Sequence, residues 1–225
     1  MFVIAHAGGG LDGKTYLNSK EAFFVHYRQG TRTFEFDIML TKDNEVIATH
    51  EFEEYDWDEK HRKTLAEYKG KHSRLLTIDD ILQLATIYRD VTILLDTKED
   101  DVKTIDIYVN ICDKIETLDP ELYSRVIPQI YNEATYKHVE THCHFDQYIF
   151  ATYKTKMGRK DIQEVVNKYP KIKGITVPGN KFKSFMIALF KGKKQVYVYT
   201  INSRFLRFIS RFFRFDGVYS DYLGK

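Results

Sequence analysis

The chain has 225 residues, which is long enough to bury one large core and suits a single domain over residues 1–225. No fixed-period repeat, low-complexity tract or linker rich in Ser, Gly or Pro interrupts it. No apolar run approaches the roughly eighteen residues of a membrane span, and the opening MFVIAHAGGG lacks the basic region of a signal peptide. The sequence therefore excludes repeat and membrane-spanning proteins, and we expect a cytoplasmic protein.

The formal net charge is +2, but the charges are spread unevenly along the chain. Residues 1–153 carry 17 basic and 28 acidic side chains, whereas residues 154–225 carry 17 basic and 4 acidic ones. Such a split either forms a charge dipole across a closed fold or serves an anionic partner.

The two cysteines, Cys112 and Cys143, lack the CxxC spacing of metal and redox motifs. Thiols stay reduced in the cytoplasm of most organisms. We therefore expect unpaired structural thiols rather than a disulfide or metal ligands.

Short segments rich in β-branched and aromatic residues alternate with segments that have apolar residues at helical spacing. The expected strands cover residues 2–7, 33–39, 45–51, 91–98, 125–131, 147–153, 174–179, 195–202 and 216–221. The clearest expected helices cover residues 19–29, 77–88, 102–117, 132–142, 159–169, 182–191 and 203–213. This alternation predicts a parallel sheet covered by helices, and the number of units favours an α/β fold of the closed (β/α)8 type, a TIM barrel, over an open sheet.

Nine expected strands are one more than such a barrel needs. The additional strand lies within residues 33–51, where the four-residue TKDN segment is too short for a crossover helix. This segment is either a hairpin or a barrel step without its helix, so we expect an irregularity at the second and third strands.

Two carboxylates lie two residues apart in the second expected strand. Because residues i and i+2 of a strand share a face, Glu35 and Asp37 point the same way, which in a barrel is toward its axis. The alternative is an amphipathic strand with both charges in solvent.

Other charged residues at strand ends favour the barrel interpretation. His6 ends the first expected strand, His50 ends the third, and Asp96 and Lys98 share a face at the end of the fourth. The carboxyl ends of barrel strands are where active sites form. Carboxylate oxygens suit a hard divalent cation, and two imidazoles can supply a base and an acid near neutral pH. The combination fits the cleavage of a phosphodiester.

The motifs, taken together, resemble those of the glycerophosphodiester phosphodiesterases, which share their barrel and two-histidine chemistry with phosphatidylinositol-specific phospholipases C. The family pattern contains HRG, NTxEAF, ExD followed by LTKDG and HD, then ExK, WTVN and TDYP. The corresponding segments here are HAGGG (6–10), NSKEAF (18–23), EFDIMLTKDNEVIATHE (35–51), LTIDDIL (76–82), LDTK (95–98), YTIN (199–202) and SDY (220–222). The matches keep their order across the whole chain, which makes them more specific together than any one alone.

The resemblance implies hydrolysis of a glycerophosphodiester, or of a lipid or polymer that contains glycerol phosphate, and so a place in lipid metabolism. It implies acid–base roles for His6 and His50. It also implies a divalent metal ion, Mg²⁺, Ca²⁺ or Mn²⁺, bound by Glu35, Asp37 and Asp96. The expected substrate contacts come from Lys98, which the resemblance places at the phosphate, and from Gln129, Tyr199 and Asn202.

Four positions depart from the family pattern. Ala7 replaces the arginine of HRG, so one phosphate-binding guanidinium is missing. Asp96 replaces a glutamate and is one methylene shorter, Glu51 replaces the aspartate after the second histidine, and Tyr199 replaces a tryptophan. Because the acid, base and metal groups are retained, we expect an active enzyme with altered specificity.

A nucleotide-binding P-loop is one alternative. GGGLDGKT, residues 8–15, fits GxxxxGK[ST] and follows a strand. Such a loop needs its helix to begin at the Lys-Thr pair, so that helix amides hold the phosphate. Here Asn18 is the expected N-cap, with Glu21 three residues later, so the helix begins about four residues too late. A catalytically silent barrel that binds an anionic glycan, lipid or protein is the other alternative.

The basic C-terminal third contains SRFLRFISRFFRF, residues 203–215. Arg204, Arg207 and Arg211 form one stripe of a helix and apolar residues form another. This pattern suits an outer barrel helix with solvated arginines, and it also suits a helix that lies on an anionic surface. Our hypothesis is that this region attracts an anionic membrane surface, through peripheral contact, or a phosphate-bearing polymer. We expect no nucleic-acid partner.

Overall fold

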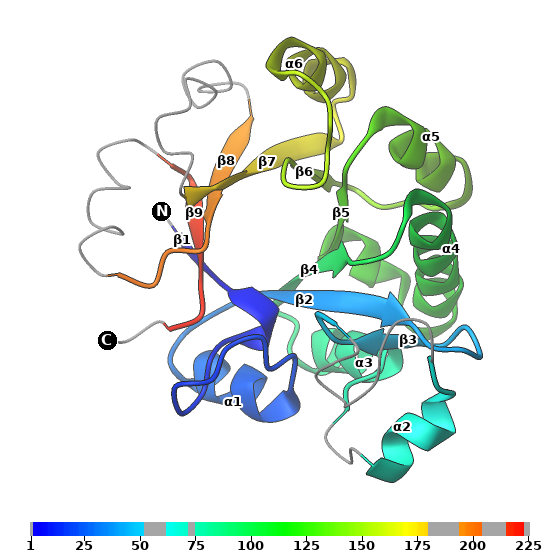
Figure 1. Cartoon of the computed structure of the whole chain (residues 1–225), viewed down its shortest axis with the longest axis vertical. Helices are drawn as coiled ribbons and strands as arrows, with labels where there is room; N and C mark the ends of the chain where they lie inside the picture. The colour runs from blue at the N-terminus through cyan, green and yellow to red at the C-terminus, as the bar shows by residue number, and fades with distance from the viewer. Residues whose placement is uncertain (1, 52–61, 72–74, 180–193, 204–214, 223–225) are drawn as a thin grey trace.

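The fold is a ring of strands with helices around it, as Figure 1 shows for the computed structural model. The structure describes residues 2–51, 62–71, 75–179, 194–203 and 215–222. Its strands are β1 Phe2–Ala5, β2 Thr33–Leu40, β3 Val46–Ala48, β4 Thr92–Thr97, β5 Val126–Ile130, β6 Tyr148–Ala151, β7 Ile172–Pro178, β8 Gln195–Tyr199 and β9 Gly217–Ser220. Its helices are α1 Lys20–Arg28, α2 Leu65–Lys71, α3 Ile78–Ile87, α4 Asp101–Leu118, α5 Glu133–His142 and α6 Arg159–Lys168, with 3-10 turns at His6–Gly8 and Pro120–Ser124.

Eight parallel strands close the barrel. They pair in the order β1-β2-β4-β5-β6-β7-β8-β9, and β9 returns to β1, where Ala5 is opposite Ser220. Helices α1, α4, α5 and α6 lie outside this ring (Figure 1). The expected TIM barrel is confirmed, and all nine expected strands are present.

The additional strand belongs to a hairpin. β3 runs antiparallel to β2, with Ala48 opposite Ile38, and it pairs with no other described strand. The reversal between them is tight, since the N–H of Thr41 donates to the carbonyl of Glu45 and Asn44 has a φ of 60°. The irregularity expected at the second and third strands is therefore a hairpin. Helix α2, which follows it, was not predicted from the sequence.

The barrel interior changes character along its axis. A layer of mainly apolar side chains fills its middle, contributed by Ile4, Leu94, Ile127, Ile149, Tyr197 and Tyr219. Gly174 makes room for Tyr197, because a Cβ at this glycine would lie 2.6 Å from Cε2 of the tyrosine ring. Toward the carboxyl ends of the strands, the inward residues become polar, and this change positions the site.

Two expectations from the sequence are wrong. Ser19, not Asn18, caps α1, because the Ser19 side chain accepts a hydrogen bond from the N–H of Ala22 while Asn18 turns toward β2. Cys112 and Cys143 form a disulfide between α4 and the end of α5, with their Cα atoms 5.7 Å apart. The packing of the two helices brings together cysteines that are 31 residues apart, which no local spacing could predict.

Two expected helices of the basic C-terminal third fall on residues that the structure does not describe. The helix expected at 182–191 lies outside the described residues, and so does the helix expected at 203–213 apart from its first residue, including Arg204, Arg207 and Arg211. Among the helices that are described, none is long and apolar enough to cross a bilayer.

Candidate active site

A pocket of about 150 Å³ opens at the carboxyl ends of the barrel strands. One side of it carries ionisable groups from β1, β2, the end of the hairpin and β4, namely His6, Glu35, His50, Asp96 and Lys98. The rest of the ring, from β5, β7, β8 and β9, contributes uncharged side chains, namely Gln129, Thr176, Tyr199 and Tyr219. The pocket therefore has an ionic wall and a neutral wall, and we keep these two names below.

The three expected metal ligands lie together beside the ionic wall. Glu35, Asp37 and Asp96 are 2%, 0% and 4% exposed, and one carboxylate oxygen of each lies within 4.8 Å of the others. The sheet register explains this grouping, because Asp37 of β2 lies opposite Asp96 of β4, and Glu35 is one inward position earlier on β2. Strand alternation and parallel pairing thus form an acidic cluster in the barrel mouth.

The donor set of this cluster fits a hard divalent cation. Three buried carboxylates offer only oxygen atoms, which are the ligands that Mg²⁺, Ca²⁺ and Mn²⁺ prefer. Asp37 Oδ1 is buried, and its described partner is Lys98, whose Nζ is 2.7 Å away. Lys98 contacts Asp37 and Asp96, and a divalent cation bound by the cluster would relieve the repulsion between these carboxylates and Glu35.

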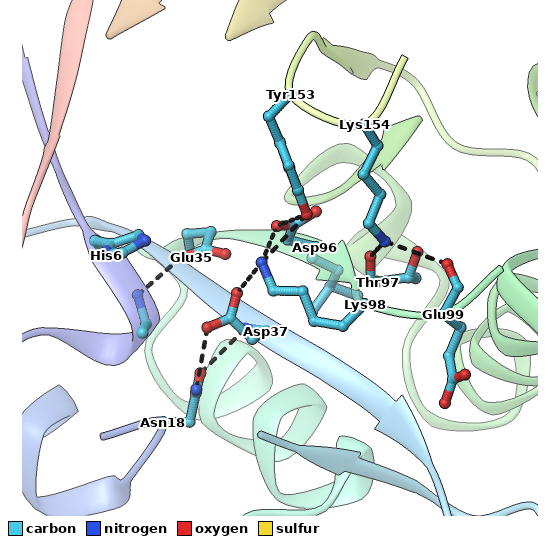
Figure 2. A network of polar contacts seen from close by, with 12 residues as sticks. His6, Asn18, Glu35, Asp37, Asp96, Thr97, Lys98, Glu99, Tyr153 and Lys154 are labelled. Carbon is cyan, nitrogen blue, oxygen red and sulfur yellow. Dashed lines mark hydrogen bonds and ion pairs between the residues drawn. The ribbon is translucent and has the colours of Figure 1, made fainter. Parts of the chain in front are cut away.

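Lys98 lies between two of the carboxylates, as Figure 2 shows. Its Nζ is 2.7 Å from Asp37 Oδ1 and 2.5 Å from Asp96 Oδ2. Burial disfavours the charged form of Lys98, but Asp37 and Asp96 outweigh this effect and raise its pKa. Burial likewise opposes the charge on Asp37, but Lys98 and His6 lower its pKa to about 2. For Glu35, burial and then repulsion from Asp37 raise the pKa well above its usual value.

Two tyrosines orient Asp96, and the sequence analysis missed both. Tyr131 donates its hydroxyl to Asp96 Oδ1 and also contacts the carbonyl of Thr97 at 2.9 Å. Tyr153 donates to Asp96 Oδ2 at 2.8 Å. Each tyrosine is the last residue of an expected strand, at 125–131 and 147–153, so its position at a carboxyl end was a usable signal.

Backbone and amide groups of the first loop hold the other two carboxylates. The N–H of Ala7, whose φ is 49°, donates to Glu35 Oε2 at 2.7 Å. Asn18 accepts from the N–H of Asp37 at 3.0 Å and donates to Asp37 Oδ2 at 3.3 Å. The asparagine expected to cap the helix therefore orients a candidate metal ligand.

His6 is oriented by a carboxylate that the sequence analysis did not single out. Its Nδ1 lies 2.7 Å from Asp221 Oδ1, and both side chains are nearly buried. Asn202 donates to Asp221 Oδ2 at 2.6 Å and accepts from the N–H of Asp221 at 2.8 Å. Asn202, for which a substrate contact stays a prediction, is not among the residues that line the pocket, and it orients Asp221. Asp221 lies in the SDY segment, which was the available signal.

Tyr16 lies between the two histidines. Its ring centroid is 4.9 Å from that of His6 and 4.6 Å from that of His50. The side chain is 38% exposed, and its hydroxyl makes no hydrogen bond with a described residue. Burial and the nearby Asp221 raise the pKa of Tyr16, which keeps the hydroxyl protonated as a donor. Nothing in the local sequence marked this residue.

The first loop does not have P-loop geometry. Leu11 and Lys14 pair with each other across a turn in which Asp12 and Gly13 both have positive φ. The helix begins at Lys20, five residues after Thr15, so no helix amide is available to the Lys-Thr pair. The nucleotide-binding alternative is not supported.

Comparison with known proteins relates this fold to one group of enzymes. No family model and no curated protein matches the chain. A glycerophosphodiester phosphodiesterase from Thermotoga maritima has a TM-score of 0.76 and 18% identity, with 98% of this chain and 94% of that one covered. One from Parabacteroides distasonis has a TM-score of 0.76, 17% identity and coverages of 98% and 92%. An Oleispira antarctica phosphodiesterase, in complex with the product sn-glycerol-3-phosphate, has a TM-score of 0.76, 17% identity and coverages of 99% and 93%. At these identities, the likeness shows a shared barrel fold along almost the whole chain.

Proposed function

We propose that this protein is a metal-dependent phosphodiester hydrolase that acts on a glycerophosphodiester, or on a lipid or polymer that contains glycerol phosphate. The observation that carries the proposal is the convergence of two histidines, three carboxylates and one lysine at a single barrel mouth. The structural neighbours, which are named as glycerophosphodiester phosphodiesterases, support the same reaction class. The complex of one of them with sn-glycerol-3-phosphate supports the class of substrate.

The acidic cluster and Lys98 would bind the phosphate end of the substrate. A divalent cation, when held by Glu35, Asp37 and Asp96, supplies positive charge that offsets the charge developing on the phosphate. Lys98 is next to this cluster and lines the pocket, so its ammonium can contact a phosphate oxygen.

The two histidines would move the protons. Because Asp221 engages Nδ1 of His6, Nε2 is left to accept the proton of an attacking hydroxyl next to the phosphate. The hydroxyl oxygen bonds to phosphorus, the bond to the leaving alcohol breaks, and His50 gives its proton to the departing alkoxide. Water then opens the cyclic phosphate, with the proton transfers reversed.

The direct test is hydrolysis of bis(4-nitrophenyl) phosphate and of simple glycerophosphodiesters with Mg²⁺, Ca²⁺ or Mn²⁺, and with a chelator as control. Turnover that depends on the metal supports the proposal. Binding of an anionic ligand without turnover under all three metals would instead support the catalytically silent barrel.

The partner and the location are also part of the proposal. The excess of basic over acidic residues in 154–225 supports a polymeric or membrane-presented anionic substrate. The sequence favours a cytoplasmic protein with peripheral membrane contact, but the Cys112–Cys143 disulfide weighs against a reducing compartment. Titration of free thiols in the protein purified without reductant tests this point.

A further inference from the structure

Three of the eight histidines of the chain lie close together in sequence, within residues 138–144 at the end of α5. They are His138, His142 and His144, and all three are exposed. Helix α5 lies on the outside of the barrel (Figure 1), and none of the three histidines lines the pocket at the barrel mouth. The proposed reaction therefore makes no use of this group of histidines.

His138 and His142 stand on one face of α5. A spacing of four residues places them one turn apart, and their rings are nearly parallel, with an interplanar angle of 11° and centroids 6.3 Å apart. Two imidazoles at this spacing on a helix can bind one transition-metal ion through a ring nitrogen of each. Because both side chains are exposed, small rotations can bring their nitrogens to the usual distance of about 2.0–2.1 Å from a shared ion.

A hydrogen bond determines which ring nitrogen of His142 is free. Its Nδ1 lies 2.9 Å from the backbone carbonyl oxygen of His138. A carbonyl oxygen can only accept, so Nδ1 carries the proton and donates it, and Nε2 keeps its lone pair. Histidines that bind metals almost always donate their other ring nitrogen to such an acceptor, which fixes the ring and makes the binding nitrogen more basic. His142 is therefore already oriented as a ligand.

The end of the helix also favours a bound cation. His142 is the last residue of α5, and Cys143 follows it as the C-cap. The last carbonyl groups of a helix carry partial negative charge, which stabilises a positive ion near the final turn. The positive charge of the nearby Lys137 is offset, because its Nζ is 3.1 Å from Glu133 Oε1.

His144 does not complete the pair. It lies beyond the end of α5, and its ring packs against that of Tyr123, with the centroids 6.1 Å apart. Within the described part of the chain, no third His, Cys, Asp or Glu lies close enough to form a group with His138 and His142. The described residues thus supply two ligands, and water would fill the remaining positions around an ion.

We infer that His138 and His142 form a binding site for a divalent transition metal that prefers imidazole, such as Zn²⁺, Cu²⁺ or Ni²⁺. The donors distinguish this site from the acidic cluster, whose carboxylates suit a hard cation. A bound ion joins the last two turns of α5, directly before Cys143, which the disulfide connects to α4. The site therefore stabilises the end of α5, and it does not depend on the proposed phosphodiesterase function.

Calorimetric titration with Zn²⁺ tests the site. Asp37→Asn serves as the parent protein, because this substitution weakens the acidic cluster and leaves α5 unchanged. Adding His138→Gln or His142→Gln should raise the dissociation constant for Zn²⁺ by about tenfold or more, since each removes one of two ligands that act at high effective concentration. All the substituted histidines are exposed, so circular dichroism should show an intact fold.

His144→Gln in the same parent is the matched control, because it removes an exposed histidine two residues beyond the pair. It should bind Zn²⁺ as the parent does. Equal affinity in all four proteins would overturn the inference, because the ion would then bind elsewhere. A loss in His144→Gln as large as that in His142→Gln would also overturn it, because the pair would not be the site.

Thermal unfolding measures the effect of the ion on α5. An ion that binds the folded helix more tightly than the unfolded chain raises the melting temperature. Zn²⁺ should therefore raise the melting temperature of the parent and of His144→Gln alike, and raise it less in His138→Gln and His142→Gln. Equal shifts in all four proteins would overturn the conclusion that the ion joins the two turns of the helix.

Discussion

His6 Nδ1 and Asp221 Oδ1 lie 2.7 Å apart although 215 residues separate them in the chain. Closure of the barrel produces this pair, because β1 and β9 are neighbours and Ala5 lies opposite Ser220, one residue before each partner. Asn202, which follows β8, fixes the other oxygen of Asp221. The orientation of His6 therefore depends on β1, β8 and β9, the neighbouring strands at which the barrel closes.

We predict that Asp221→Asn lowers kcat by roughly 10²-fold. The amide would present an N–H to Nδ1 of His6 and favour the tautomer whose Nε2 is protonated, which cannot accept a proton from the substrate. Steady-state rates on a glycerophosphodiester measure the effect. Asp216→Asn is the control, since Asp216 accepts from the N–H of Val196 at the opposite end of the same strands. Equal losses in the two variants would assign Asp221 to barrel stability alone.

We predict that His6→Ala and His50→Ala each lower turnover by roughly 10²-fold or more, the usual scale for general acid–base groups. Circular dichroism should show an intact fold, because both side chains lie at the barrel mouth. Lys14→Ala should retain most activity, since Lys14 is exposed in the turn of the first loop. Near-normal turnover in either histidine variant would remove that histidine from catalysis.

The metal prediction concerns Asp37, which is fully buried in the acidic cluster. Asp37→Asn removes one anionic ligand, so the dissociation constant for Mn²⁺ or Mg²⁺ should rise by about tenfold or more while the melting temperature changes little. Calorimetric titration of the metal into the chelator-treated protein gives the constant directly. Asp113→Asn on the exposed face of α4 should bind the metal as the wild type does. An unchanged titration for Asp37→Asn would reject this cluster as the metal site.

The three carboxylates of the acidic cluster can be predicted from the sequence, whereas the residues that orient the site, such as Asp221 and Tyr131, are harder to predict. Glu35, Asp37 and Asp96 were found because strand alternation and strand ends are local features, and a parallel sheet places such ends at one edge. Asp221 and Tyr131 act through contacts between strands that are distant in sequence, so their partners depend on barrel closure.

The hairpin and the disulfide have the same explanation. The sequence shows that the TKDN link between the two strands is short. The structure identifies a hairpin rather than a barrel step, because β3 runs antiparallel to β2 and pairs with no other described strand. Cys112 and Cys143 meet because α4 packs on α5. Asparagine often caps helices, but the side chain of Asn18 accepts a hydrogen bond from the N–H of Asp37 in β2, and Ser19 is the N-cap of α1. Tertiary contacts decided each of these cases.

We predict that Glu99 stabilises the fold in a pH-dependent way. Arg62 donates to its two oxygens at 2.6 and 2.8 Å, and the N–H of Leu40 donates at 3.0 Å. Burial opposes the charge, but these donors outweigh it and hold the pKa of Glu99 below its usual range. A lowered folded-state pKa means that this stabilisation is present above the unfolded pKa of about 4.3 and is lost as the pH falls through the folded value.

Urea unfolding of the wild type and Glu99→Gln at several pH values measures this effect. The difference in unfolding free energy should be constant between about pH 7 and pH 5 and should shrink below about pH 4. Glu121→Gln is the control, because Glu121 is exposed and its nearest described cation, Arg89, is 3.8 Å away. A difference for Glu99→Gln that does not vary with pH would show that shape, not charge, determines its contribution.

Basic residues outnumber acidic ones by 17 to 4 in residues 154–225. Charge of this kind acts mainly on encounter with an anionic partner and is screened within about 8 Å at physiological salt. Cleavage of a glycerol-phosphate polymer, or of a diester presented on acidic vesicles, should therefore fall steeply between low and physiological ionic strength. Cleavage of a small soluble diester should barely change, because it carries a single charge.

Arg207→Glu combined with Arg211→Glu should reproduce this selective loss at low salt, since the pair lies in residues 203–215, which contain four arginines and no acidic residue. Arg89→Glu is the control, because Arg89 is an exposed arginine in the acidic part of the chain. If the polymer, the vesicle-bound diester and the small diester respond alike to salt and to the substitutions, the basic residues are only a solvated face. A small soluble glycerophosphodiester then becomes the better substrate, because encounter with it does not require an extended region of positive charge.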